Sequence, residues 1–223
     1  MRPPGRPPAR QPFDFSLYLV TDQQLCGENS LLDVVGLAVR GGAQVVQLRE
    51  KRLGMRALVD LARALCGLLE PFGIPLIIND RVDAALAVGA AGAHLGQSDM
   101  PVDLARLLLG PQAIIGLSVE RLEHIREAER HDVDYYGVSP IFPTGTKAEL
   151  VNAWGLGGLA AARRATARPL VAIGGIGLDN AEAVVRAGAD GVAVVSAICA
   201  APDPLKAAED LLRAVRQGKN AVQ

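Results

Sequence analysis

The chain has 223 residues, of which 50% are hydrophobic and 4% aromatic, and its formal net charge is −1. That length is within the range of a single α/β barrel. A core so poor in aromatic residues must be built from Ala, Val, Leu and Ile, which suits a buried parallel sheet covered by helices. The balanced charge gives no argument for a nucleic-acid or membrane partner, and we expect neither.

The compartment is predicted from the cysteines and from the first residues. Cys26, Cys66 and Cys199 show no close pairing, so neither a disulfide framework nor a zinc site is expected, and a reducing cytoplasm fits best. We expect Cys66 and Cys199 to be small buried hydrophobic residues. The first residues lack the apolar segment of a signal peptide, and no apolar run is long and uncharged enough to span a bilayer.

Composition also predicts the domain organisation. Residues 1–12 are rich in Pro and Arg and predict a disordered extension, because such a segment buries too little apolar surface to offset its ordering entropy. Residues 13–218 are expected to form one catalytic domain, and residues 219–223 a C-terminal tail.

From Ser16 onward, short runs rich in β-branched residues alternate with longer segments whose apolar residues recur at helical spacing. The short runs predict eight strands: Ser16–Thr21, Gln44–Arg49, Pro75–Asn79, Gly92–Leu95, Ala113–Ser118, Val133–Ser139, Leu170–Ile173 and Gly191–Val195. The longer segments predict helices over Leu31–Arg40, Arg56–Glu70, Val82–Val88, Val102–Leu109, Arg121–Arg130, Gly157–Ala165, Asp179–Ala187 and Pro204–Arg216.

Glycines mark a repeated joint between helix and strand. They stand where three of the predicted helices end, near Gly42, Gly89 and Gly188, and a glycine there adopts the left-handed C-cap conformation without a Cβ clash. Asn29–Ser30, Asp80 and Asp179 are residue types that cap the start of a helix. Eight repeated units in this length favour a single closed (β/α)8 TIM barrel, with a doubly wound open sheet as the alternative.

Barrels of this kind carry their active groups at the carboxyl ends of the strands. After the second strand, side-chain alternation points Gln47, Arg49 and Lys51 one way, while Val46 and Leu48 face the helices. Two cations and an amide there suit a cluster of anionic oxygens such as a diphosphate. The alternative is a solvated run of charges.

Carboxylates follow the next two strands. Asp80 and Asp99 end neighbouring strands, and Mg²⁺ typically takes one or two carboxylates and completes its shell with water and phosphate oxygens. The alternative is that each only caps the helix after it. His94 suits either a general base or a structural residue near the rim, and His124 and His131 are expected on the surface.

The connection after the sixth strand is the longest and includes Thr144, Gly145, Thr146 and Lys147. Two hydroxyls, a glycine and a lysine suit a phosphate or diphosphate, and long loops of compact barrels often act as lids. The alternative is a solvated loop. Ser118, at the end of the fifth strand, suits either a hydrogen bond to substrate or a helix cap.

The ends of the seventh and eighth strands carry the glycine pair Gly174 and Gly175 and the pair Val195 and Ser196. Loops at these positions are the recurrent phosphate site of such barrels, where backbone N–H groups point at the anion. A phosphate site here and a second polyanion site at strands two to four imply a reaction between two phosphorylated compounds.

Several segments together resemble the thiamine-phosphate synthase family, in the family's order. The resemblance spans about Ser16 to Arg216, whereas the extension and the stretch Glu149–Trp154 fall outside the family pattern. The segments are Tyr18–Asp22, Gln47–Lys51, Asn79–Val82, His94–Asp99, Phe142–Lys147 and Ile173–Ile176.

The resemblance implies a transferase of thiamine biosynthesis that joins 4-amino-2-methyl-5-(diphosphooxymethyl)pyrimidine to 4-methyl-5-(2-phosphooxyethyl)thiazole, giving thiamine phosphate and diphosphate. It implies Mg²⁺ on Asp80 and Asp99. It implies that the pyrimidine diphosphate contacts Gln47, Arg49, Lys51, Asn79, Ser118 and Lys147, with Arg49, Lys51, Ser118 and Lys147 catalytic. It implies a thiazole phosphate near Thr144, Gly145, Thr146, Gly174, Gly175, Val195 and Ser196.

The residues suit a dissociative reaction in which diphosphate leaves before the thiazole attacks. None of them resembles a nucleophile with a positioned base, and the cations would stabilise charge on the leaving group. Two other functions share this pattern in part. A thiazole tautomerase would need a well-placed general base and no diphosphate site, and a non-catalytic phosphate-binding regulator could dispense with the aspartates. A homo-oligomer and a monomer are both compatible with the sequence.

Overall fold

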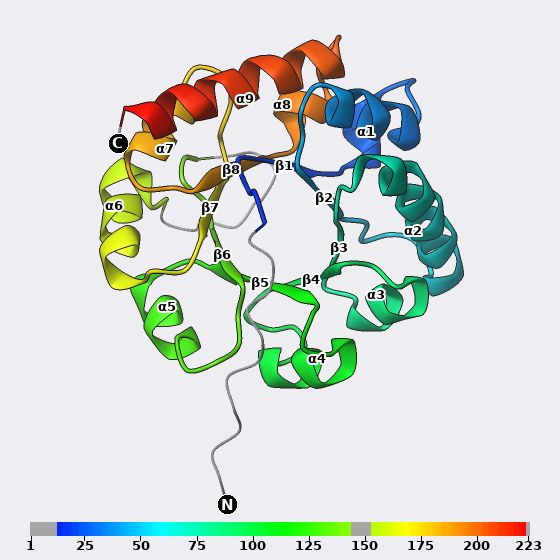
Figure 1. The fold of residues 1–223 in the computed structure, drawn as a ribbon, viewed down its shortest axis with the longest axis horizontal. Coiled ribbons are helices and arrows are strands. Elements are labelled where there is room, and N and C mark those ends of the chain that lie inside the picture. The colour runs from blue at the N-terminus through cyan, green and yellow to red at the C-terminus, as the bar shows by residue number, and fades with distance from the viewer. Residues whose placement is uncertain (1–12, 144–152, 222–223) are drawn as a thin grey trace, which may run out of the picture.

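A computed structural model describes residues 13–143 and 153–221. Eight parallel strands form a closed barrel in sequence order, with β1 paired to β8 (Figure 1). The predicted (β/α)8 barrel is confirmed, and the open doubly wound sheet is wrong. The strands are β1 Leu17–Val20, β2 Val45–Leu48, β3 Leu76–Asn79, β4 Gly92–Leu95, β5 Ile114–Val119, β6 Tyr135–Val138, β7 Leu170–Ile173 and β8 Gly191–Val194.

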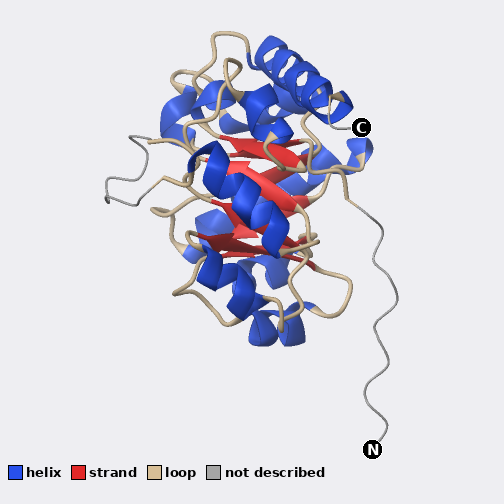
Figure 2. Cartoon of the chain, turned by 90° about the vertical axis from the view of Figure 1, so that its left-hand side faces the viewer, coloured by secondary structure: helices blue, strands red, loops and turns tan. Residues whose placement is uncertain are grey.

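Helices ring the barrel (Figure 1), and the side view shows the strands enclosed by them (Figure 2). In the described part of the chain they are α1 Leu31–Arg40, α2 Met55–Leu69, α3 Val82–Val88, α4 Val102–Leu109, α5 Leu122–Ala128, α6 Gly155–Ala165, α7 Ala181–Arg186, α8 Ser196–Cys199 and α9 Pro204–Asn220, with 3₁₀ turns η1 Gln23–Cys26 and η2 Glu70–Phe72. The bounds predicted for α1, α3 and α4 are confirmed. None of the helices described is long and apolar enough to cross a membrane.

The bounds of α2, α5, α6 and α7 differ from the predicted ones by one or two residues, and two α-helices depart further from the sequence prediction. Ser196–Cys199 forms the short helix α8, which was not predicted because four residues give no helical periodicity. Helix α9 runs four residues past its predicted end at Arg216, to Asn220. Its Gly218 is buried, and a Cβ there would lie 2.8 Å from Val185 Cβ, so close packing of α9 on α7 supports this last turn.

The helix ends follow the glycine prediction but not the aspartate one. Gly42, Gly89 and Gly188 have φ values of 106°, 65° and 116°, so each takes the left-handed conformation expected there. The predicted cap at Ser30 is confirmed, since its side chain accepts a hydrogen bond from Asp33 N–H at 3.1 Å at the start of α1. Asp80 and Asp179 do not cap helices: Arg81 and Asn180, which follow them, occupy the cap positions of α3 and α7, and neither makes a side-chain cap bond. Asp80 is therefore free for another role.

Side-chain alternation divides the core into two shells. The outer shell fills the space between sheet and helices and includes the cysteines Cys26 and Cys199, which are buried as free thiols, while Cys66 is half-buried beside it. The inner shell fills the barrel and is capped from below by Phe13 and Phe15. Its strand residues are Tyr18, Val20, Val45, Ile77, Ile114, Tyr135, Val171 and Ala193.

The close approach of neighbouring strands generates a stability prediction. A Cβ on Gly92 would lie 1.8 Å from the Ile114 carbonyl oxygen on β5. We expect Gly92→Ala to destabilise the protein by about 1–3 kcal/mol or more, since overpacking of a fixed backbone forces strands apart. Denaturant unfolding measures the change.

Gly67→Ala is the matched control. Gly67 lies in the interior of α2, and a Cβ there would meet nothing within 4 Å, so alanine at this position should stabilise by about 0.5–1 kcal/mol. Equal stability of the Gly92→Ala variant and the parent would show that β4 and β5 can shift to make room.

Candidate active site

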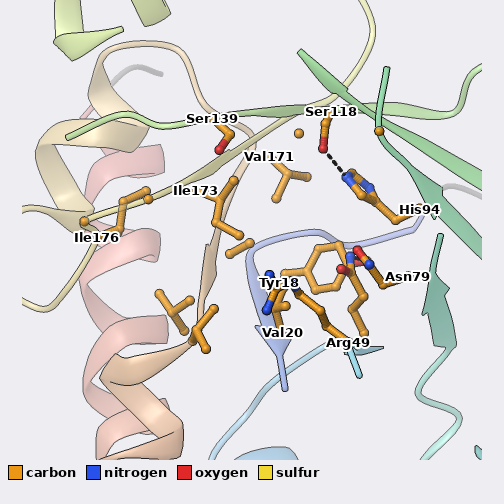
Figure 3. A pocket seen from close by; sticks show the side chains of 18 of the residues that line it. Tyr18, Val20, Arg49, Asn79, His94, Ser118, Ser139, Val171, Ile173 and Ile176 are labelled. Atoms are coloured by element: carbon orange, nitrogen blue, oxygen red, sulfur yellow. Dashed lines mark hydrogen bonds between the residues drawn. The ribbon is translucent and has the colours of Figure 1, made fainter. Parts of the chain in front are cut away.

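A cavity opens at the carboxyl ends of the barrel strands (Figure 3). Its volume is about 1150 Å³, somewhat above the range of about 300–1,000 Å³ usual for one small ligand. Of the predicted site residues, Thr144, Gly145, Thr146 and Lys147 lie outside the described part of the chain. All the others line this one cavity: Gln47, Arg49, Lys51, Asn79, Asp80, Asp99, Ser118, Gly174, Gly175, Val195 and Ser196.

Strand β2 and the residues after it supply the basic side of the cavity. Gln47, Arg49 and Lys51 all line the cavity, whereas Val46 and Leu48 are buried in the outer shell. The predicted alternation is confirmed. Gln47 is only 4% exposed, so its amide is held within the barrel, while the two cations stand at the rim.

Two carboxylates stand next to this basic group. Asp80 and Asp99 lie within hydrogen-bonding reach of one another, and the Asp80 carboxylate is 3.8 Å from Lys51 Nζ. Asp80 has φ of 61°, and no other non-glycine residue in the described part of the chain has a positive φ. Such a conformation costs on the order of 1 kcal/mol, and it places the side chain on the cavity wall.

The pKa of Asp80 reports the crowding of negative charge. Burial raises this pKa above its ordinary value, and the neighbouring Asp99 raises it further, whereas Lys51 and Arg49 act in the opposite direction with a smaller effect. Asp99 is fixed differently, because its carboxylate accepts a hydrogen bond from Gly96 N–H at 2.6 Å. The alternative prediction that Asp99 caps the next helix is wrong, since Pro101 occupies the cap position of α4.

The donor set of this acidic pair fits a hard divalent cation. The described residues contain no cluster of three or more side chains able to hold a metal by themselves. Two carboxylates in contact are nevertheless what Mg²⁺ uses when water and substrate phosphate supply its other ligands. The raised pKa of Asp80 also supports a cation site, because a bound cation would relieve the repulsion between the two carboxylates.

Glycines shape the opposite side of the cavity. Gly174 and Gly175 have φ values of 102° and 66°, which side chains rarely adopt. A Cβ on either would lie 2.8 Å from a side chain of the segment after β6, Pro140 or Phe142 respectively. Asn180 holds this loop, since its amide donates to the Gly175 carbonyl at 2.9 Å, a contact that sequence reasoning missed.

The end of β8 passes directly into helix α8. Val195 and Ser196 stand at this junction, and both line the cavity. Amide groups at the start of a helix lack partners within that helix and can donate to an anion. The glycine loop and this junction therefore form a second region suited to a phosphate. They follow β7 and β8, which lie across the closed barrel from the strands β3 and β4 that carry the acidic pair.

The centre of the cavity floor is a hydrogen-bonded group that the sequence did not indicate. His94 is 9% exposed, and its Nε2 lies 2.9 Å from Ser118 Oγ, as the dashed line in Figure 3 shows. Its Nδ1 lies 2.8 Å from Tyr135 Oη, and Tyr135 contacts Tyr18 at 2.8 Å. Of the two alternatives for His94, this bonding supports the structural residue.

The other two histidines lie outside this cavity. The prediction that His124 is on the surface is wrong: it is 5% exposed and its Nδ1 accepts a hydrogen bond from Glu120 N–H at 3.2 Å. Burial and the nearby Arg121 lower the pKa of His124. His131 is partly exposed and lies 2.9 Å from Asp103.

The fold and the cavity define a class, the (β/α)8 barrel enzymes whose polar groups at the strand ends suit phosphorylated ligands. Comparison with known proteins gives the family. The family described as "Thiamine monophosphate synthase" matches residues 17–198. A thiamine-phosphate synthase of Albidiferax ferrireducens is 60% identical over 192 residues, covering 86% of this chain and 88% of the relative. The chain therefore belongs to the thiamine monophosphate synthase family.

Further comparisons agree. A thiamine-phosphate synthase of Azorhizobium caulinodans is 56% identical over 90% of this chain and 94% of its own. A solved thiamine phosphate pyrophosphorylase from Pyrococcus furiosus superposes with a TM-score of 0.84 at 38% identity, over 92% of this chain and 97% of that one. A 3-hexulose-6-phosphate synthase, with a TM-score of 0.64 at 16% identity over 89% of this chain and 99% of that one, shares the fold alone.

The acidic pair generates a prediction about stability and pH. Because the folded-state pKa of Asp80 is raised, ionising this carboxyl costs folding free energy at neutral pH, and the cost vanishes as the pH falls through its ordinary value of 3.8. We expect Asp80→Asn to raise the Tm of the metal-free protein at pH 7, and the gain to disappear near pH 4. Thermal unfolding with a chelator measures both.

Asp83→Asn is the control of opposite sign. Arg81 holds the pKa of Asp83 below its usual range, so losing that charge should lower the Tm at pH 7 by a small amount. A lower Tm for Asp80→Asn at pH 7 would mean that the attraction of Lys51 and Arg49 outweighs the burial of the carboxyl.

Proposed function

We propose that this chain joins hydroxymethylpyrimidine diphosphate to hydroxyethylthiazole phosphate, forming thiamine phosphate and releasing diphosphate. The observation that carries the proposal is that one cavity holds two different anion-suited regions. The first combines Arg49 and Lys51 with an acidic pair, and the second is the glycine loop with the start of α8. Membership of the thiamine monophosphate synthase family supports the same reaction.

The two regions divide the substrates between them. The proposal assigns the pyrimidine diphosphate to the region of β2 to β5, with Gln47, Arg49, Lys51, Asn79 and Ser118 as contacts and Lys147 from the connection after β6. It assigns the thiazole phosphate to the other region, with Gly174, Gly175, Val195 and Ser196, joined by Thr144, Gly145 and Thr146.

Asp80 and Asp99 are the residues that would hold Mg²⁺. When bound, the ion would supply positive charge to the diphosphate oxygens. The carboxylates' proximity and the raised pKa of Asp80 support this assignment.

The protein's own cations stabilise the departure of diphosphate in the proposed reaction. The bond between the pyrimidine methylene carbon and the diphosphate oxygen breaks, and its electron pair leaves with the diphosphate. Arg49 and Lys51 face the charge that develops on that oxygen. The thiazole nitrogen then donates its lone pair to the carbon, forming the new C–N bond. No proton is transferred, so the reaction needs no general base.

The hydrogen bonds of His94 favour the synthase reaction over tautomerisation. A tautomerase would need a base free to take a proton, whereas both ring nitrogens of His94 are within hydrogen-bonding distance of Tyr135 and Ser118.

The proposal includes a cytoplasmic location, since the three free thiols suit a reducing compartment. Its partners are the two small phosphorylated substrates, with no nucleic acid or membrane.

The reaction is tested by supplying both substrates and measuring thiamine phosphate and diphosphate. We expect product only with both substrates and Mg²⁺ present. Asp80→Asn and Asp99→Asn should each lower kcat by about 100-fold or more, which corresponds to losing about 3 kcal/mol of charge stabilisation. Circular dichroism should show an intact fold in both variants.

Asp83→Asn, on the exposed face of α3, serves as the activity control and should retain the parent rate. Near-normal rates of both active-site variants at saturating Mg²⁺ would rule out the metal assignment. Absence of product from the parent protein with both substrates would rule out the proposed reaction, and isomerisation of a thiazole substrate alone would indicate a tautomerase.

The order of bond breaking is tested with an altered substrate. Replacing the methyl group on the pyrimidine ring by trifluoromethyl withdraws electrons and destabilises a methylene cation. Single-turnover chemistry should slow by about 100-fold or more, while the affinity for the pyrimidine changes by less than about threefold. An unchanged single-turnover rate would mean that the thiazole attacks before diphosphate departs.

A further inference from the structure

We propose that Tyr135 and His94 are positioning residues that direct the hydroxyl hydrogen of Ser118 into the cavity. They belong to a hydrogen-bonded series that we term the interior chain, which crosses the barrel from β2 to β5. Its members are Gln47, Tyr18, Tyr135, His94 and Ser118. The part of this inference that concerns the reaction rests on the proposed function, in which Ser118 contacts the pyrimidine diphosphate.

The interior chain is continuous and almost wholly buried. Gln47 Nε2 donates to Tyr18 Oη at 2.9 Å, and the two tyrosine hydroxyls are 2.8 Å apart. Tyr135 Oη is 2.8 Å from His94 Nδ1, and His94 Nε2 is 2.9 Å from Ser118 Oγ. The first four residues are 4%, 1%, 1% and 9% exposed, so water does not compete for the three bonds between them. The last bond, from His94 to Ser118, is partly buried at the cavity surface.

The hydrogen bonds of the interior chain can run in either of two directions, depending on which atom of each pair donates its hydrogen. Burial raises the pKa of Tyr18 and of Tyr135, so both keep their protons. A neutral imidazole has one donor and one acceptor nitrogen. If Tyr135 donates to Nδ1, then Nε2–H donates to Ser118, and the serine hydrogen is available to the cavity. In the reverse order Ser118 donates to Nε2 and offers only lone pairs.

Two observations favour the first direction. Gln47 already donates to Tyr18 at the start of the chain, and hydrogen bonds that all point the same way strengthen one another. The cavity around Ser118 also contains Arg49 and Lys51, which suit an anionic ligand, and an anion needs a donor from the serine rather than a lone pair. His94 is therefore expected to carry its proton on Nε2.

The barrel makes room specifically for this pair of rings. A Cβ on Gly116 would lie 2.1 Å from Tyr135 Cζ, and a Cβ on Gly137 would lie 2.9 Å from His94 Cε1. Neither glycine has a positive φ, so neither is needed for an unusual backbone. Glycine on β5 and β6 instead provides the space in which His94 and Tyr135 meet.

The test removes one hydroxyl from the interior chain and keeps its ring. Tyr135→Phe separates Tyr18 from His94 and should lower kcat with both substrates by about tenfold, the scale of one lost charge-assisted hydrogen bond. The KM for the thiazole phosphate should change by less than about threefold.

Tyr136→Phe is the matched control. Tyr136 is the next residue on β6, faces the helices, and donates its hydroxyl to Glu129 at 3.1 Å. This substitution also removes one hydroxyl from the same strand, but it should leave kcat within about twofold. Loss of activity in both variants to the same extent, or in neither, would overturn the proposal.

A double variant shows whether Tyr135 acts through the serine. If it does, Ser118→Ala combined with Tyr135→Phe should be as slow as Ser118→Ala alone, because the hydrogen that Tyr135 orients is already gone. Effects of the two substitutions that multiply would show that Tyr135 acts by another route, such as packing, and would overturn the proposal.

Nitrogen NMR of the histidine rings decides the inference without substrate. The chain has three histidines, so the His94 signals can be assigned by substitution. We expect a proton on Nε2 and none on Nδ1 in the parent protein, and a weaker preference in Tyr135→Phe. A proton on Nδ1 would overturn the inference even if the proposed reaction stands. If the proton is on Nε2 but the protein shows no synthase activity, the inference about the tautomer stands and the proposed function is wrong.

Discussion

The pairing of β1 with β8 closes the sheet, and the arrangement of the active site depends on this closure. The register sets Leu17 opposite Val192 and Leu19 opposite Val194. Because all eight strands are parallel, closure gathers their carboxyl ends around one rim. Gln47 on β2 and Ser196 after β8 are far apart in the chain and yet border the same cavity. In an open sheet these groups would lie along a line and could not surround one cavity.

Closure also separates two environments within the barrel. Below the cavity, the inner shell is apolar and aromatic and is sealed by Phe15. Above it, charged groups of both signs stand within a few ångströms, as the distance of 3.8 Å between Lys51 and Asp80 shows. The acidic pair is unfavourable by itself, which the raised pKa of Asp80 records. Two carboxylates that repel one another are suited to bind a cation.

Much of the fold could be predicted from the sequence, because apolar runs and glycine joints are local signals. The strands were found because each is a short apolar run, and the left-handed conformation at Gly89 followed from the helix pattern before it. The Asp80 cap was wrong, since a positive φ at a non-glycine residue leaves no mark in the sequence. The burial of His124 was missed because its helix is otherwise highly charged.

The sequence predicts those residues of the candidate site that follow the end of a strand, but not the contacts between side chains inside the barrel. The alternation of side chains was sufficient to bring Gln47, Arg49 and Lys51 to one wall. The contact between Tyr135 and His94 depends instead on the registers of β4, β5 and β6, in which Gly116 faces both His94 and Tyr135. Register is a property of the assembled barrel, and a single sequence does not specify it residue by residue.

Tyr18 and Tyr135 both fill the core and line the cavity, and this limits how the cavity could change during evolution. Both rings are part of the apolar filling of the barrel, and both line the cavity above it. Deepening the cavity by trimming either ring would leave a void in the core, at a cost of about 3–5 kcal/mol, which is a large share of a domain's net stability. Changes at the rim carry no such cost. Evolution toward bulkier substrates should therefore proceed through the loops above the strands, while the depth of the cavity stays fixed by the requirement to fold.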